Sequence, residues 1–304
     1  FLLVYIILAL TFGYTLIMAE TSLGRMTRKS PVGAFESFGN SRFISIGGWI
    51  NAIIPILIVP YYSVIGGWVI KYLIEYFAGH SKTLAGDAYF TTFISNGWST
   101  EICFIIFTLF TLGIIYAGVR NGIERVSKFM MPILIVLSLI IAVYSVTRPG
   151  AIEGVKYFLV PNFDHFSWMT VVSAMGQMFY SLSIAMGILI TFGSYMKKDT
   201  SIEKSTENVE IFDTAIAIMA GLMIIPAVFA FSGGNAETLK SGPALMFITI
   251  PKVFANMGFG TAIGVVFFLL VLFAAVTSSI ALTESAVSTF EDELHWSRKK
   301  STVF

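Results

Sequence analysis

The sequence predicts an all-α polytopic membrane protein that forms one transmembrane domain over residues 1–304. Of these residues 56% are hydrophobic and only 12% are charged, and the mean hydropathy is +0.82. Soluble domains are about 25% charged, so this composition indicates a chain surrounded by lipid. Its apolar stretches reach the length that crosses a bilayer and lack the period-two alternation of strands. Backbone polar groups in lipid must be satisfied internally, so these stretches are predicted to be helices.

Seven apolar stretches are predicted to span the membrane in turn. They are, in chain order, about 1 to 19, 47 to 78, 102 to 118, 129 to 147, 168 to 195, 209 to 232 and 259 to 290. The second contains Pro55 and Pro60 and the sixth contains Pro226. Proline removes a backbone hydrogen bond, so these helices are expected to bend.

The basic residues predict the orientation. Thirteen of the 19 Lys and Arg residues lie in four segments, 20 to 46, 118 to 128, 196 to 208 and 291 to 304. Because basic residues concentrate in cytoplasmic loops, we expect a multi-pass protein of the cell membrane with its N-terminal end outside and its C-terminal end in the cytoplasm. The chain begins at Phe1, inside an apolar stretch, so we also expect that a helix precedes it.

Several classes of function are excluded by composition. Cys103 is the single cysteine and no Cys/His cluster has metal spacing, which excludes a disulfide framework and a zinc site. A formal net charge of +1 gives no broad patch for nucleic acid. No nucleophile, base and orienting acid gather at one site, so we predict neither an enzyme nor an organic cofactor.

Two polar features of the apolar regions leave alternatives open. Tyr61 and Tyr62 follow Pro60 at what is expected to be mid-bilayer, where each hydroxyl needs a partner, either another helix or a ligand. The outer loop 233 to 258 contains ALMFITIPKVFANM, which is too short to span the membrane. That segment is expected to form a short helix that either covers an outer vestibule or packs on the outer surface.

The stretch GQMFYSLSIAMG, residues 176–187, concentrates glycines and polar side chains within an apolar region. Small residues favour close helix packing, but they also permit a break at which freed carbonyls line a cavity. Gln177, Tyr180, Ser181 and Ser183 supply more donors and acceptors than a packing seam needs. This surplus favours a broken helix that presents oxygen atoms to an ion or to an ammonium group.

The stretch LFAAVTSSIALTES, residues 272–285, predicts a cation site. The carbonyl of Ala274 and the hydroxyls of Thr277 and Ser278 lie at positions i, i+3 and i+4, on one face of a helix. Hydroxyls in helices often bond the carbonyl four residues back, which is the structural alternative. Three hard oxygens that converge on one point suit a small hard cation, and sodium is the plausible one.

Asp213 is an acid inside an apolar helix, and such residues are functional candidates by default. It lies only three residues beyond Glu210, so an alternative is that it sits near the start of a helix and interacts with the helix dipole. Glu20 and Glu284 lie nearer to the ends of predicted spans and are expected to have mostly structural roles.

Five motifs in order resemble the neurotransmitter:sodium symporter family, with bacterial sodium-dependent amino-acid transporters as the nearest relatives. They are AETSLGRMTRKSP, VPYYSVIGGW, AGVRNGIERVSKFMMP, GQMFYSLSIAMG, and FAAVTSSIALTESAVSTFEDEL followed by SRKK. The resemblance covers essentially all 304 residues. It implies a partial inverted-repeat symporter fold, in which this chain corresponds to the second to eighth helices and the beginning of the ninth.

The resemblance also implies a set of site residues. Tyr62 matches the tyrosine that hydrogen-bonds the substrate carboxylate, and Tyr180 matches the aromatic residue that closes over the substrate. The full substrate set is Ile58, Tyr62, Tyr180, Ser181, Ser183, Met186 and Leu282. The sodium ligands are Ser181, Asp213, Ala274, Thr277 and Ser278.

Two further roles follow from the resemblance. Asp213 is the candidate for a fixed negative charge, with Tyr5 and Gln177 resembling its shell, and chloride independence is expected. Gly122 and Pro132 match a pattern at the inner end of the family's fifth helix, where local unwinding would admit water to a sodium site.

Together these features predict a sodium-coupled symporter that imports a small amino acid by alternating access. The expected partners are the amino acid, sodium ions and the lipid bilayer, with no nucleic acid, and the oligomeric state is unknown. One alternative is a proton-coupled transporter of the same broad fold, with Asp213 or Glu284 as the relay. Another is a non-transporting seven-helix membrane protein.

Overall fold

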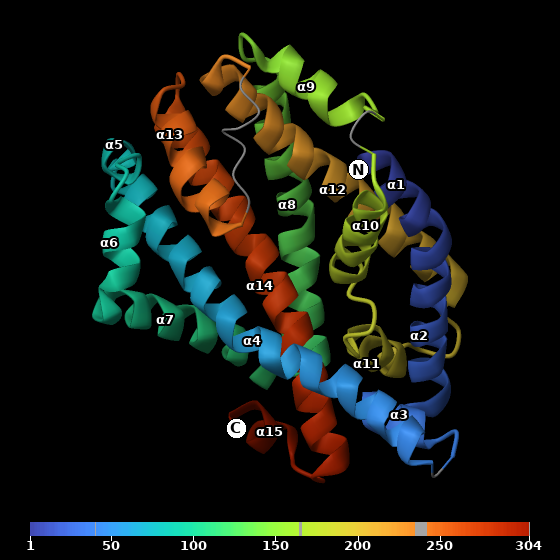
Figure 1. The fold of residues 1–304 in the computed structure, drawn as a ribbon. Helices are drawn as coiled ribbons and strands as arrows, with labels where there is room; N and C mark the ends of the chain where they lie inside the picture. The colour runs from blue at the N-terminus through green and yellow to red at the C-terminus, as the bar shows by residue number, and fades with distance from the viewer. Residues whose placement is uncertain (40, 164–165, 235–241, 304) are drawn as a thin grey trace.

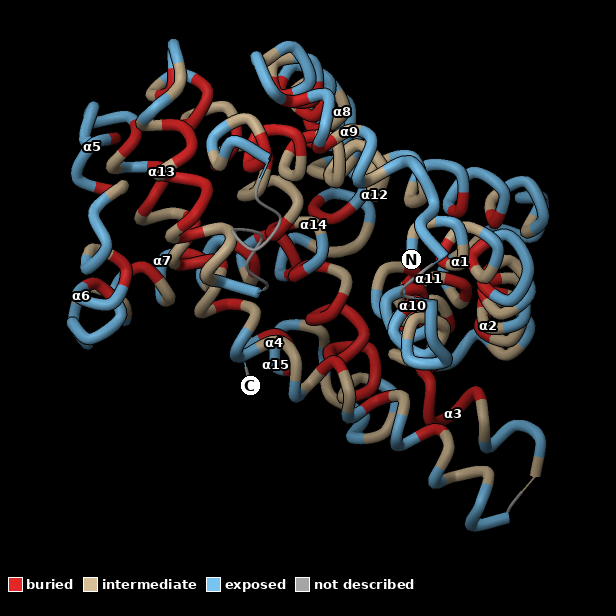
Figure 2. The backbone as a smooth tube through the Cα atoms, turned by 45° about the horizontal axis from the view of Figure 1, so that its top comes forward, coloured by how far each residue is buried: buried red, intermediate tan, exposed pale blue. Residues whose placement is uncertain are grey.

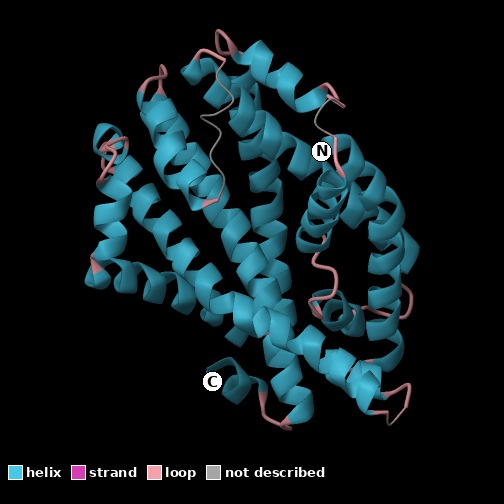
Figure 3. Cartoon of the chain, in the orientation of Figure 1, coloured by secondary structure: helices cyan, strands magenta, loops and turns pink. Residues whose placement is uncertain are grey.

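Helices joined by loops make up the described part of this protein, which contains no strand (Figure 3). The computed structural model describes every residue except 40, 164–165, 235–241 and 304. Figure 1 shows a long central helix, α14, beside α4 and α8, with α2, α10 and α11 together on one side.

The elements run in chain order as follows. They are α1 (Leu2–Leu8), the π-helix η1 (Ala9–Gly13), α2 (Tyr14–Thr27), α3 (Pro31–Glu36), α4 (Arg42–Phe77), α5 (Ser81–Leu84), α6 (Tyr89–Ser95), α7 (Gly97–Tyr116), the π-helix η2 (Val119–Glu124), α8 (Arg125–Val146), α9 (Ala151–Leu159), α10 (Trp168–Ser181), α11 (Ile188–Tyr195), α12 (Ile202–Ser232), the π-helix η4 (Leu245–Thr249), α13 (Ile250–Ala255), α14 (Gly260–Glu293) and α15 (Arg298–Val303).

Six of the predicted spans are continuous helices that are long and apolar enough to cross a membrane. They are Leu2–Thr27, Arg42–Phe77, Gly97–Tyr116, Val119–Val146, Ile202–Ser232 and Gly260–Glu293. The predicted span 168–195 instead holds two shorter helices, α10 and α11. The all-α, multi-pass fold class predicted from the sequence is therefore confirmed.

Side-chain caps explain where several helices begin. The Ser201 side chain accepts a hydrogen bond from the backbone N–H of Lys204 at the start of α12, and Asn96 does the same for Ser99 at the start of α7. At α10, Ser167 and Thr170 form a reciprocal capping box. Each cap satisfies backbone donors that have no partner within the helix.

The largest apolar core lies around α14, where it meets α4, α8, α12 and α13. Figure 2 shows the buried residues concentrated along α13 and α14. Phe247 and Phe254, from the segment 245–255, are each only 1% exposed, and the Tyr72 hydroxyl donates to the Phe247 carbonyl at 2.8 Å. This segment therefore packs firmly against the transmembrane helices.

The contact between α2 and α11 depends on glycine. A Cβ atom at Gly24 would lie 1.9 Å from the carbonyl oxygen of Ile190, and one at Gly193 would lie 2.4 Å from the carbonyl of Thr21. Only glycine permits backbones to approach this closely. The contact fixes α11 beside α2, and thereby fixes one side of the break between α10 and α11.

We expect Gly24→Ala to lower the free energy of unfolding by about 2 kcal/mol or more, because a methyl group forces the two backbones apart. Gly113→Ala is the matched control, since it is also in a long helix and no heavy atom lies within 4 Å of the place that its methyl group would take. The control should be neutral or slightly stabilising, as alanine favours helix. Thermal unfolding in detergent measures both, and equal transitions for the two variants would contradict the packing argument.

Candidate functional site

A break between α10 and α11 lies at the centre of the candidate site. α10 ends at Ser181 and α11 begins at Ile188, and between them Ser183, Ala185 and Gly187 have φ angles of +57°, +60° and +68°. Left-handed conformations of non-glycine residues are costly and persist only where the surroundings hold them. The broken helix that the sequence predicts within residues 176–187 is thus present in the backbone.

Glu20 on α2 holds this break from one side. The Ala185 backbone N–H donates to its Oε1 atom at 2.8 Å. The other carboxylate oxygen, Oε2, is buried and has no hydrogen-bond partner among the described residues. The sequence predicted a mostly structural role for Glu20. The signal for its place beside the break was a carboxylate within an apolar helix.

A first group of oxygens gathers around Asp213. The Ser181 hydroxyl lies 2.9 Å from Oδ1 and 2.8 Å from Oδ2 of Asp213, and the Tyr5 hydroxyl donates to Oδ2 at 3.1 Å. The three residues come from α10, α12 and α1, so the group depends on tertiary packing. α12 begins at Ile202, which places Asp213 about three turns inside the helix. The alternative of a dipole interaction at the helix start is therefore wrong.

A second group of oxygens lies between α14 and α4. The Thr277 hydroxyl lies 3.0 Å from the carbonyl oxygens of both Phe273 and Ala274. Ser278 is exposed, and its side chain hydrogen-bonds with Tyr62. Ala274, Thr277 and Ser278 thus lie at positions i, i+3 and i+4 of α14, and the Thr277 hydroxyl makes the bond to the carbonyl four residues back that the structural alternative predicts.

Tyr180 adjoins the first group and reaches α4. Tyr180 is the last residue but one of α10, directly before Ser181, and is 48% exposed. Its hydroxyl hydrogen-bonds with Tyr61 of α4. Tyr61 was not among the predicted site residues. The pair of tyrosines after Pro60 was the sequence signal for a site here. Only the fold shows that Tyr61 faces α10 and Tyr62 faces α14.

The remaining predicted residues have more varied positions. Ile58, Ser183 and Met186 are half-buried, and Leu282 is only 5% exposed, one turn of α14 beyond Ser278. Gln177 is exposed on α10, and no hydrogen bond joins it to Asp213 in the described part of the chain.

The two predicted gating residues lie in one irregular helix. Gly122 is within the π-helix η2, where a Cβ atom would lie 2.0 Å from the Ile114 carbonyl, and Pro132 is inside α8. A π-helical turn that leads into a proline-containing helix has weaker backbone hydrogen bonding than a regular helix. The gating role of Gly122 and Pro132 stays a prediction.

A buried ion pair lies at the far end of α14. Glu284 has no exposed surface, and Arg298 of α15 donates to its two oxygens at 2.9 and 2.5 Å. The Tyr195 hydroxyl at the end of α11 donates to Glu284 Oε1 at 2.7 Å. Sequence reasoning missed this cluster, which ties α11, α14 and α15 together.

The fixed charge and hard oxygens of the site define its chemistry. A carboxylate, hydroxyls and a helix carbonyl are ligands suited to a small alkali cation, and no soft ligand is among them. The tyrosine hydroxyls and the interrupted backbone near 182–187 add directional hydrogen-bonding groups. Such a set can bind a cation and a small zwitterion side by side without any covalent step.

Comparison with known proteins gives consistent matches. The model of the sodium:neurotransmitter symporter family matches residues 74–304. An uncharacterized sodium-dependent transporter, YhdH of Bacillus subtilis, is 33% identical over 303 residues, which are 99% of this chain and 66% of that protein. An uncharacterized sodium-dependent transporter of Haemophilus influenzae is 30% identical, with coverage of 100% and 68%.

Comparison with solved structures gives a match of the same kind. The crystal structure of MhsT in complex with L-phenylalanine superposes with a TM-score of 0.89 at 35% sequence identity, over 99% of this chain and 68% of that chain. The present chain thus spans about two thirds of the length of the relatives that it matches.

Proposed function

This chain belongs to the sodium:neurotransmitter symporter family, and from that membership we propose that it forms the central part of a sodium-coupled symporter that imports a small amino acid. The observation that carries the proposal is the pair of oxygen groups, one joined to the broken helix and the other on α14. One contains Asp213 and Ser181, and the other contains Ala274, Thr277 and Ser278.

In this proposal each oxygen group binds one sodium ion. Asp213 supplies a fixed negative charge to the first, and Ser181 connects that charge to the broken helix. The Ala274 carbonyl and the Thr277 hydroxyl already lie side by side in the second. Sodium entry there would require the Thr277 hydroxyl hydrogen to turn away from the carbonyl, which costs little because a hydroxyl rotates freely.

The amino acid would lie between the two groups. Tyr62 and the break near Ser183 supply polar contacts to the zwitterion, and Ile58 and Met186 supply apolar ones. Tyr180 would close over the substrate from the outside. L-Phenylalanine is bound by the similar protein MhsT, and a flexible methionine at position 186 would adapt to side chains of different shape.

Coupling follows from differential affinity. If sodium and the amino acid both bind better to one arrangement of α10, α11 and α14, each shifts the equilibrium in favour of the other. Because α11 is tied to Glu284 of α14 through Tyr195 and to α2 through Gly24, movement of the broken helix would be transmitted to α2 and α14. The basic segments are assigned to the cytoplasmic side.

The experiment that tests this function is uptake into proteoliposomes that contain the protein expressed from its complete gene. Labelled neutral amino acids are supplied outside under an imposed sodium gradient, at equal pH on both sides. Uptake that needs the sodium gradient is expected. Uptake that follows an imposed proton gradient and ignores sodium would support the proton-coupled alternative instead.

The second oxygen group has its own test. We expect Thr277→Val to weaken the apparent sodium affinity about tenfold or more, because one oxygen ligand is lost at constant size. Thr277→Ser retains the hydroxyl and should stay within about threefold of the parent protein. Sodium titrations of amino-acid binding measure both, and equal sodium affinities for the Val and Ser variants would remove Thr277 from the site.

A further inference from the structure

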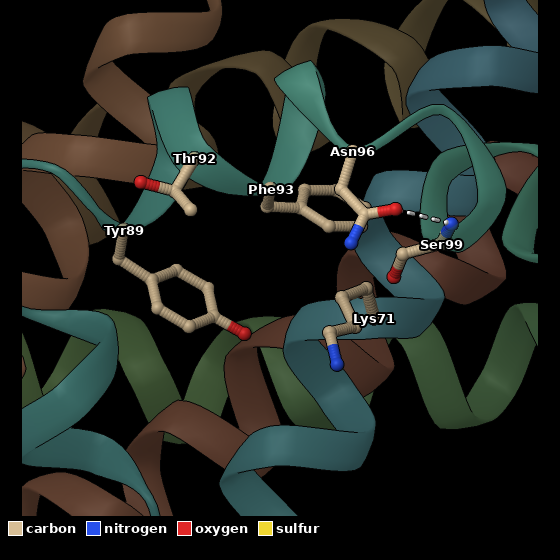
Figure 4. A pocket seen from close by; sticks show the side chains of 6 residues that line it. All are labelled: Lys71, Tyr89, Thr92, Phe93, Asn96 and Ser99. Carbon is tan, nitrogen blue, oxygen red and sulfur yellow. Dashed lines mark hydrogen bonds between the residues drawn. The ribbon is translucent and has the colours of Figure 1, made fainter.

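A cavity of about 180 Å³ lies where α4, α6 and α7 meet, away from the broken helix. Its lining is Lys71, Tyr89, Thr92, Phe93, Asn96 and Ser99. Figure 4 shows the polar ends of Lys71 and Tyr89 on one side of the hollow, with Thr92 and Asn96 on the opposite side. An adjoining, more open hollow of about 510 Å³ shares Thr92 and Asn96 and is lined otherwise by Thr91 and Ser95.

The cavity is rich in hydrogen-bond donors. Asn96 uses its side-chain oxygen to accept from the Ser99 backbone N–H, so its amide NH₂ remains as a donor. Lys71 gives one of its three N–H groups to Glu75 at 2.6 Å, and Thr92 and Ser99 contribute hydroxyls. Burial, the nearby Glu75 charge and a hydrogen bond to Glu75 raise the pKa of Tyr89 to about 12, so its protonated phenol is engaged with Glu75 at the edge of the cavity.

The carboxylate nearest to the cavity is already engaged. Glu75 accepts from Lys71 through Oε1 and contacts His80 through Oε2, both at 2.6 Å. Its charge reduces the field of Lys71, but its oxygens are directed to these two partners and to the Tyr89 phenol. Asn96 also begins α7, a 20-residue helix whose first backbone N–H groups add positive potential at the same place. An acceptor-rich, negatively charged group is the complement of this lining.

The cavity lies at the expected depth of the membrane interface. Trp98, two residues after Asn96, is 83% exposed, and tryptophan gathers at the boundary between lipid chains and water. Lys71 lies near the end of α4, six residues before Phe77. Phospholipid headgroups occupy this same layer, and the open hollow lined by Thr91, Thr92, Ser95 and Asn96 can hydrogen-bond the hydroxyls of a glycerol headgroup.

We propose that the cavity formed by Lys71, Tyr89, Thr92, Asn96 and Ser99 binds the phosphate group of a membrane phospholipid with a hydroxyl-bearing headgroup. Bound there, the lipid would bridge α4 to the short helix α6 and to the start of α7. This site is independent of the sodium and substrate groups, so the proposal stands or falls separately from the proposed transport function.

The test measures binding to the detergent-purified, delipidated protein expressed from its complete gene. Three probes are titrated: dihexanoyl-phosphatidylglycerol below its micelle concentration, dihexanoyl-glycerol, which lacks phosphate, and inorganic phosphate. We expect the phosphatidylglycerol to bind at least tenfold more tightly than either of the others. Equal affinity for dihexanoyl-glycerol would overturn the role of phosphate, and equal affinity for inorganic phosphate would overturn the lipid assignment.

Asn96→Asp is the decisive variant. Aspartate caps a helix as well as asparagine does, so α7 should still begin at the same place, while the added negative charge opposes phosphate. We expect phosphatidylglycerol to bind at least tenfold more weakly, and Lys71→Met to act in the same direction. Lys82→Met, an exposed lysine on neighbouring α5 outside the lining, is the matched control and should stay within twofold. Unchanged binding by Asn96→Asp would refute the site.

Discussion

Asp213→Asn is expected to weaken sodium-dependent amino-acid binding by about 100-fold or more. The variant keeps the shape of the side chain but removes the fixed negative charge that Ser181 and Tyr5 hold in place. Hydrogen bonds and ion contacts to a charged group are each worth about 1.5–3 kcal/mol, and 1.4 kcal/mol is a tenfold change in affinity. The measurement is equilibrium binding of a labelled amino acid at a series of sodium concentrations.

Ser181→Ala is the companion variant, since it removes a hydroxyl but leaves the charge. Its expected loss is about tenfold. Replacement of chloride by gluconate should leave the parent protein unchanged, because Asp213 already provides the anion. If Asp213→Asn binds sodium and substrate as well as the parent does, the first oxygen group is not a sodium site.

Arg298→Met is expected to lower the free energy of unfolding by about 3–5 kcal/mol, the cost of leaving a buried carboxylate without its partner. Glu284 has no exposed surface, and Arg298 donates to both of its oxygens. Burial alone would lower the pKa of Arg298, but the hydrogen bonds and charges of Glu284 and Glu291 raise it, so the guanidinium stays charged. Thermal unfolding in detergent measures the loss.

Two further variants separate the ion pair from general damage to α15. Glu284→Gln together with Arg298→Met removes both charges and should recover most of the stability, because no unpaired charge remains. Lys299→Met, at the exposed neighbouring position, should change little. A double variant that is less stable than Arg298→Met alone would contradict this interpretation of the pair.

The fold was largely predictable because the membrane imposes a simple rule. Long apolar stretches must be helices, and the six continuous spans lie where composition predicts them. The break at 182–187 was also predictable from the sequence, since Ser181, Ser183 and the flanking glycines are unusual within an apolar stretch. Local composition thus carries information about both the spans and their break.

Contacts between residues on different helices were harder to predict from the sequence. Glu20 reaches Ala185 over a separation of 165 residues, and Tyr5 reaches Asp213 over 208. Such contacts depend on helix rotation and crossing, which a single sequence specifies only weakly. The same holds for Glu284. Its position near the end of a predicted span does not indicate that Arg298 of α15 folds back and pairs with it.

We propose that sodium ions bound to the oxygens of α10, α12 and α14 create the amino-acid site. Calorimetric titration of the purified protein from the complete gene with its preferred amino acid, in matched sodium and potassium buffers, tests this claim most directly. We expect a dissociation constant at least tenfold lower in sodium. Equal dissociation constants in the two buffers would contradict it.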